Sequence, residues 1–187
     1  MITNSPTQML EDEHVVIAKV VAAAPLLADL LEAGQTVDVE TLRGVVEFMR
    51  TFADKCHHGK EEELLFPLLL KKGVPAEGCP VGPLMAEHTA GRALVRKLAD
   101  AAKAYQSGDP AAKEAVVQGL RGIGTLYPNH IWKEDYLLFP MTLKVVGLEE
   151  QQALYHQFEQ VEERVGRDVH QRLEQFAERL AASTQAG

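Results

Sequence analysis

The chain has few cysteines, no basic cluster and no long apolar run, and each absence excludes a class of protein. Two cysteines in 187 residues cannot form a disulfide framework, so Cys56 and Cys79 are expected to be free thiols in a reducing compartment such as the cytoplasm. The net charge is −8 and Lys and Arg do not form runs, which argues against nucleic acid or a membrane surface as partner. No basic patch precedes an apolar stretch at the N-terminus and no apolar run is long enough to cross a bilayer, so neither a signal peptide nor a membrane span is expected.

Alternation of β-branched and polar residues, the usual mark of strands, is also scarce. Ala, Leu, Glu, Gln and Lys are abundant instead, which favours helices. Segments with helix-stop residues separate five predicted helices, over residues 7–33, 38–72, 83–106, 110–146 and 149–182.

Short loops between long helices predict antiparallel neighbours. The expected fold is therefore all-α, an up-down-up-down four-helix bundle over about 7–146 with an additional C-terminal helix over about 149–182. The whole chain, 1–187, is expected to form one domain. Pro67 and Pro140, which end two matching "LLFP" stretches, should kink or restart their helices in the same way.

One stretch of sequence occurs twice. "CHHGKEEELLFP" begins at Cys56 and "NHIWKEDYLLFP" at Asn129, so that His57 aligns with His130 and Glu61 with Glu134. Each copy therefore contains His-x-x-x-Glu, and residues four apart lie on one face of a helix. By itself this spacing also describes an ordinary salt-bridged helix face.

A further histidine precedes each copy at nearly the same distance. His14 lies 43 residues before His57, and His88 lies 42 residues before His130. In a four-helix bundle such groups can converge on the interior, where four imidazoles and two carboxylates without a metal would leave polar groups unpaired. Imidazole with carboxylate and no thiolate suits iron or manganese, and each carboxylate could bridge two metals.

The combined pattern, H…HxxxE…H…HxxxE, resembles the hemerythrin-like HHE cation-binding family over roughly residues 10 to 145. The resemblance implies a di-iron centre of two non-haem Fe ions that reacts with dioxygen, peroxide or nitric oxide, with electrons from an unknown donor. The ligands that it implies are His14, His57, Glu61, His88, His130 and Glu134, the two glutamates being bridges. Either a monomer or a homodimer is compatible with the pattern.

The chain departs from oxygen-carrying members of the family, which bring five histidines, two of them as His-x-x-x-His from the third helix. Here His88 is alone, with Leu84 and Arg92 at the four-residue spacings. One iron is therefore expected to lack a protein ligand, which favours chemistry on nitric oxide or peroxide over reversible carriage. The alternative is a non-catalytic module that binds dioxygen or iron or senses a gas.

Several other side chains could also be ligands or neighbours of the site. An extra ligand could come from Asp135, Tyr127, Glu159, Glu163 or His170, and Asp135 is the alternative bridge. His58 and Glu62 are expected to form a pair at the rim or in solvent. Glu13 and Glu87 are expected to be helix-face charges, because each points about 100° away from the histidine that follows it. The amphipathic C-terminal helix is expected to cover Trp132 and Tyr136.

Overall fold

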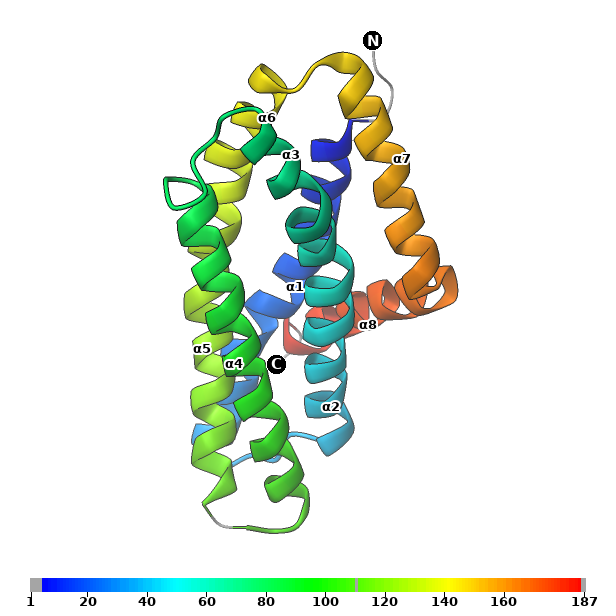
Figure 1. Cartoon of the computed structure of the whole chain (residues 1–187). Coiled ribbons are helices and arrows are strands. Elements are labelled where there is room, and N and C mark those ends of the chain that lie inside the picture. The colour runs from blue at the N-terminus through cyan, green and yellow to red at the C-terminus, as the bar shows by residue number, and fades with distance from the viewer. Residues whose placement is uncertain (1–4, 110, 186–187) are drawn as a thin grey trace.

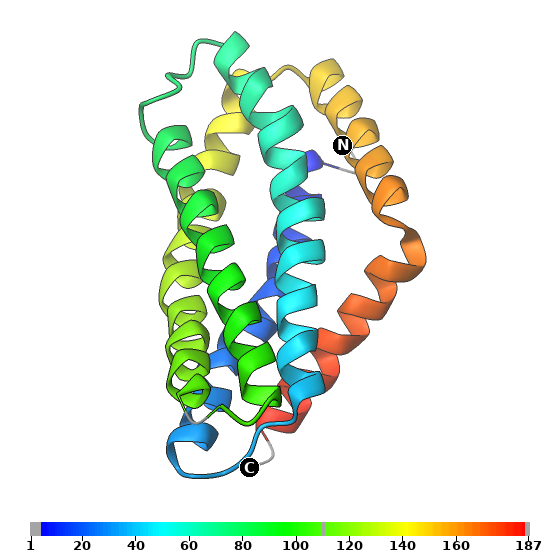
Figure 2. The ribbon, with the colours of Figure 1, turned by 60° about the horizontal axis from the view of Figure 1, so that its bottom comes forward.

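The computed structural model describes residues 5–109 and 111–185, and every regular element in these ranges is helical (Figure 1). The all-α prediction is confirmed. Four long helical segments lie side by side, and two further helices at the C-terminal end pack on one side of them (Figure 2).

The first segment is a single helix, α1 (Pro6–Glu32), which ends where Gly34 adopts a φ of +82°. Its length and apolar composition suffice for a membrane span, contrary to the expectation from the sequence. In the structure α1 packs against α5 (Ala112–Lys133) and α8 (Arg167–Gln185), and most of its apolar side chains are buried in the interior, with Val15 and Leu26 as exposed exceptions. The apolar composition of α1 is thus explained by its place as a core helix.

The second segment runs from 39 to 71, as predicted, but much of it is not α-helix. It consists of α2 (Val39–Phe48), π-helical η1 (Met49–His58) and η2 (Glu61–Leu65), and α3 (Phe66–Lys71). Asp38 caps its start, accepting a hydrogen bond from the Glu40 N–H at 3.3 Å. A π-turn is wider than an α-turn and is frequently found at functional sites.

The third and fourth segments repeat this plan. The third is α4 (Val81–Gln106), and the fourth joins α5 to π-helical η3 (Glu134–Leu138) and α6 (Phe139–Val145). Position 110, where the fourth helix was predicted to begin, lies outside the described residues. In both repeats the π-turn ends just before a proline, Pro67 or Pro140, at which α-helix restarts. Because proline has no N–H to donate, the α-helical ladder is interrupted there, and the prediction of a matching restart is confirmed.

The C-terminal part differs most from the prediction. Two helices, α7 (Leu148–Val165) and α8, replace the single helix expected over 149–182, and Gly166 between them has a φ of +102° that favours glycine. Both contact α1 and the second segment rather than the outer face of α5 (Figure 2). Trp132 and Tyr136 are 50% and 65% exposed and stack on each other, so the prediction that they are covered was wrong.

The apolar interior is divided into two clusters. One contains, among others, Ile17, Phe52, Val95 and Tyr127. The other contains, among others, Leu10, Leu65, Leu84 and Leu138. On each of the four segments the predicted site residues fall between a member of the first cluster and a member of the second, so the site lies between the two clusters.

The close approach of α1 and α5 depends on Gly124. A Cβ atom at this position would overlap Cγ of Pro25 and lie 3.1 Å from its Cδ, and the proline ring cannot rotate away. Gly124→Ala is therefore expected to lower the free energy of unfolding by ~1–3 kcal/mol, even though alanine favours helix by about 1 kcal/mol. Urea unfolding measures the change. Gly59→Ala is the matched control, since its Cβ would meet only the Asp54 carbonyl oxygen at 3.8 Å; equal stability of the two variants would contradict the prediction.

Candidate metal centre

The six predicted ligand side chains meet at one place in the interior. They come from all four long segments: His14 from α1, His57 and Glu61 from the second, His88 from α4, and His130 and Glu134 from the fourth. Each is at most 3% exposed. The structure thus brings together the six side chains that the spacing argument selected.

One half of the site is built by the first two segments. The Nε2 atoms of His14 and His57 lie 3.0 Å apart, and Oε2 of Glu134 lies 3.1 Å from Nε2 of His14. Two imidazole nitrogens that face each other at this distance repel unless a proton or a cation lies between them. The Oε2 atom of Glu134 is also 4.0 Å from Nε2 of His57, so that three donor atoms surround one point.

The other half is built by the third and fourth segments. Oε1 of Glu134 lies 3.2 Å from Nε2 of His130 and 3.5 Å from Nε2 of His88. Glu134 thus presents one oxygen to each half. Oε2 of Glu61 also faces both halves, at 3.9 Å from Nε2 of His57 and 3.5 Å from Nε2 of His88. Each of the two carboxylates therefore faces histidine nitrogens of both halves.

The second half also contains His58, for which the sequence predicted a place at the rim. His58 is 3% exposed, and its ring stacks on that of His88 with centroids 3.8 Å apart. It offers a donor atom within 4.8 Å of those of His88 and His130. The wide π-turn of η1 brings two consecutive histidines to the interior, which an α-helical projection does not allow. One signal was present in the sequence, because the repeat aligns His58 with the apolar Ile131.

A carboxylate stands behind each of the five imidazoles. Four Nδ1 atoms lie within hydrogen-bond distance of a carboxylate oxygen: His14 with Asp135 at 2.7 Å, His57 with Glu13 at 3.0 Å, His88 with Glu62 at 2.6 Å and His130 with Glu87 at 3.0 Å. Nδ1 of His58 lies 3.5 Å from Asp54. An Nδ1–H that donates to a carboxylate leaves the Nε2 lone pair free to bind a metal, and it orients the ring.

The carboxylates that contact the histidine Nδ1 atoms are arranged according to the sequence repeat. Glu13 and Glu87 precede His14 and His88 in the chain, but each reaches across to the histidine of the neighbouring segment, His57 or His130. The prediction that they are only helix-face charges was wrong. Lys60 and Lys133, which also align in the repeat, pair with these two glutamates.

The residues that follow Glu61 and Glu134 form a second matching pair. Asp135 contacts Nδ1 of His14 and is not positioned as a bridge. Glu62 contacts Nδ1 of His88 and does not pair with His58 at the rim. Arg92 in turn pairs with Glu62 and with Asp54. The surroundings of the site are therefore organised by the same duplication as the site itself.

The C-terminal helices reach the site through Glu13. The Lys60 side chain is fully buried, with Nζ 2.5 Å from Glu13 and 2.7 Å from Glu162 of α7. Nε2 of His170, on α8, lies 3.6 Å from Glu13. Burial alone would raise the pKa of Glu13, but His170, His57 and Lys60 together lower it well below its usual range. These helices therefore support the carboxylate that orients His57.

The other candidate ligands from the sequence do not join the cluster of donor atoms. Glu159 pairs with His156 and Glu163 with Arg167, both on the surface, and His170 contacts Glu13 rather than the centre. Tyr127 is buried close by, with its ring centroid 6.0 Å from that of His130, and burial raises the pKa of its hydroxyl.

Charges in the site are strongly coupled. Burial disfavours the ionised form of Glu61, and the neighbouring Glu134 adds to this, so the pKa of Glu61 is raised well above its usual value. Burial alone would raise the pKa of Glu134, but the surrounding histidines lower it. Burial would lower the pKa of His14, but Asp135 and Glu134 raise it to about 10. Burial lowers the pKa of His58 to about 3, which keeps it neutral.

The donor set fits a metal. Both oxygens of Glu61 and Glu134 and the Nε2 atoms of His88 and His130 are buried and have no hydrogen-bond partner among the described residues. Each unsatisfied buried group costs about 1–3 kcal/mol, and more when charged. Five imidazoles and two carboxylates without a thiolate are suited to iron or manganese. A cation pair in the two halves would satisfy all of these atoms at once.

His58 gives a specific prediction for metal content. His58→Ala is expected to weaken binding in the half that contains His88 and His130, so that bound metal falls from about two per chain to about one. Mass spectrometry of the purified variant measures the ratio. His156→Ala removes an exposed histidine of α7 and should leave the ratio unchanged. Unaltered metal in the His58 variant would show that this imidazole is not a ligand.

A buried, duplicated arrangement of imidazoles and carboxylates among long helices defines a class of helical metal-binding proteins. Residues 5–142 match the family described as "Hemerythrin HHE cation binding domain", and the chain belongs to this family. The chain is similar to the proteins named "Uncharacterized protein Rv1995" of Mycobacterium tuberculosis and "Uncharacterized protein Mb2018" of Mycobacterium bovis. Each is 25% identical over 134 residues, which are 72% of this chain and 52% of theirs.

The chain thus spans about half the length of the curated relatives that it matches. No solved structure matches the chain. Family membership supports cation binding by the cluster.

Proposed function

We propose that the chain is a cytoplasmic non-haem di-iron protein of one domain, with the four-helix bundle topology of hemerythrins, that binds a small oxidant or diatomic gas. His14 and His57 would hold one iron and His58, His88 and His130 the other, with Glu61 and Glu134 between them. The observation that carries the proposal is the set of seven buried donors, in which each imidazole has a carboxylate near its Nδ1 atom.

Iron in these positions would supply redox chemistry and a place for a small molecule to bind. The protein contributes orientation, through the carboxylates behind the histidines, and a dry interior, through the two apolar clusters on either side. The half with His14 and His57 has one histidine fewer, so the open position is expected there.

His58, the fifth histidine, changes the comparison between catalysis and reversible gas binding. The expectation of a missing ligand rested on His88 being alone on its helix, and the position of His58 removes that reason. Five histidines, divided three and two, equal the number that the resemblance attributes to oxygen carriers. Reversible binding of dioxygen or nitric oxide is therefore favoured as strongly as reduction of nitric oxide or breakdown of peroxide.

One experiment separates these activities. Iron-loaded, reduced protein is mixed under argon with nitric oxide and excess ascorbate with a mediator, and nitrous oxide is measured over time. Catalysis would release one nitrous oxide and one water for every two nitric oxide molecules, two electrons and two protons consumed, over many turnovers. A stable adduct that is reversed by purging with argon would indicate binding alone. Failure to bind iron, or failure to bind nitric oxide, dioxygen or peroxide once iron is loaded, would overturn the proposal.

A further inference from the structure

A second feature of the molecule lies behind His58. A groove of about 760 Å³ runs between α4 and the α2–η1 segment, and its inner wall includes His58 and Tyr127. This volume is in the range of sites for organic molecules, and it far exceeds the space needed by a diatomic gas or peroxide. The groove is therefore not explained by the proposed gas-binding centre.

The groove is strongly cationic although the chain is acidic. Six basic side chains line it: Arg43, Arg50, Lys55, Arg92, Arg96 and Lys103. Only two acidic side chains do so, Glu47 and Asp54. The chain as a whole has a net charge of −8. The groove thus has an excess of basic over acidic side chains on a protein whose net charge is negative.

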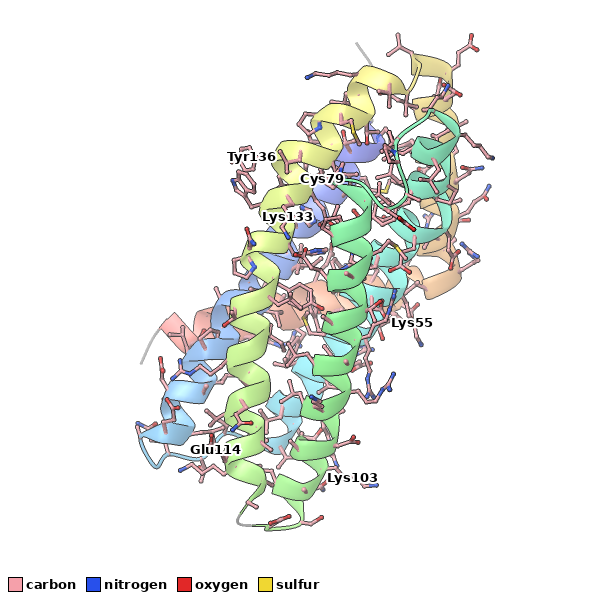
Figure 3. The ribbon with its side chains drawn as sticks, turned by 60° about the vertical axis from the view of Figure 1, so that its left-hand side comes forward. Lys55, Cys79, Lys103, Glu114, Lys133 and Tyr136 are labelled. Carbon is pink, nitrogen blue, oxygen red and sulfur yellow. The ribbon has the colours of Figure 1, made fainter. Side chains whose placement is uncertain are left out.

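Most of this positive charge is not neutralised by neighbours. Glu47 is paired with Arg172, and Asp54 with Arg92 and His58. Arg50, Lys55, Arg96 and Lys103 are exposed and make no ion pair with any residue in the described ranges. Figure 3 labels Lys55 and Lys103, which lie on the same side of the molecule, opposite the exposed Tyr136. The groove therefore presents four cations that are available to a ligand.

Apolar side chains form the rest of the groove. Val46, Met49, Val95 and Ala102 line it but are each at most 8% exposed. Its accessible apolar surface therefore comes from Ala99 and from the methylene stems of the long basic side chains. An apolar floor under a cationic rim is complementary to a molecule that has an apolar body and a negatively charged group. A fully hydrated inorganic anion would leave the floor unused.

We propose that this groove binds an organic anion with an apolar body, such as a medium-chain carboxylate. The apolar body packs on Ala99 and on the methylene stem of Lys103, and the acidic group lies against Arg50 and Arg96. The occupied groove adjoins the metal centre, because Asp54, which lines the groove, contacts His58. The binding site itself is independent of the proposed function at the metals.

The test uses the full chain and a pair of probes with the same apolar body. Binding of octanoate and of 1-octanol is measured by isothermal titration calorimetry, with the protein as purified and after metal removal. Octanoate is expected to bind more tightly than 1-octanol, and its affinity should fall as sodium chloride is raised. The double variant Arg50→Gln, Arg96→Gln should weaken octanoate binding about 10-fold, equivalent to about 1.4 kcal/mol, and leave 1-octanol binding unchanged.

A matched control lies next to Arg96 on the same helix. Lys97 is exposed and does not line the groove, so Lys97→Gln removes one positive charge without altering the site. It should change octanoate affinity less than twofold. Absence of octanoate binding, equal affinity for the two probes, or equal weakening by Lys97→Gln would each overturn the proposal. Loss of metal binding with octanoate binding retained would refute the proposed function and leave this inference standing.

Discussion

Replacing Glu61 and Glu134 together with alanine is expected to reduce bound metal from about two per chain to near zero. Glu134 presents one oxygen to each half of the centre and Glu61 faces both, so the double variant removes every carboxylate donor from both halves. The remaining imidazoles would hold two cations close together with no carboxylate between them to offset their repulsion. Mass spectrometry for metals on the purified proteins gives the ratio.

The fold of the double variant is checked by circular dichroism, since loss of metal through unfolding would be uninformative. Glu159→Ala with Glu163→Ala is the matched control, because it removes two carboxylates from the surface of α7. The control should retain the metal content of the parent. A double variant that keeps about two metals per chain would show that these carboxylates are not bridges.

Removing metal from the parent is expected to lower its melting temperature by roughly 8–16 °C. A ligand at 1,000 times its dissociation constant stabilises the folded state by about 4 kcal/mol, and each kcal/mol corresponds to about 2–4 °C for a chain of this size. Scanning calorimetry of iron-loaded and chelator-treated protein measures the difference. Equal melting temperatures would contradict a centre built into the folded core.

This difference should shrink as the pH is lowered. In the metal-free protein, Asp135 and Glu134 raise the pKa of His14 from 6.5 to about 10. The stabilisation from this pairing is complete below pH 6.5 and is lost as the pH rises toward 10. The metal-bound protein requires neutral His14, so protons compete with metal at low pH. Repeating the scans at pH 8, 7 and 6 tests the direction of the change.

The sequence was sufficient for the four long helical segments and for the convergence of six side chains, because both depend on spacing. Residues four apart share a helix face, and antiparallel neighbours bring His14, His88 and the two His-x-x-x-Glu motifs to one level. Gly166 carried a readable signal for the break between α7 and α8, since glycine favours the positive φ that it adopts there. The amphipathic pattern of these helices showed that one face is buried, but it could not show against which segment.

His58 and the supporting carboxylates could not be predicted from α-helical geometry. His58 reaches the interior because η1 is π-helical, and the choice of hydrogen-bond register depends on packing and on the matching prolines further along the chain. Glu13 and Glu87 were judged by the histidines beside them in the chain. Their partners are on the neighbouring segment, and only the packing of the helices reveals which side chains meet there.

The division of the apolar interior has a consequence for cooperativity. A layer of buried polar side chains separates the cluster around Phe52 from the cluster around Phe66, so the two share little direct apolar contact through the centre. Cations bound in this layer would couple the unfolding of one cluster to the unfolding of the other. In the metal-free protein the two ends of the molecule are therefore expected to unfold locally as separate units, and hydrogen exchange would show each with its own rate. Metal loading would merge them into a single unit, and the centre would then determine the fold's cooperativity.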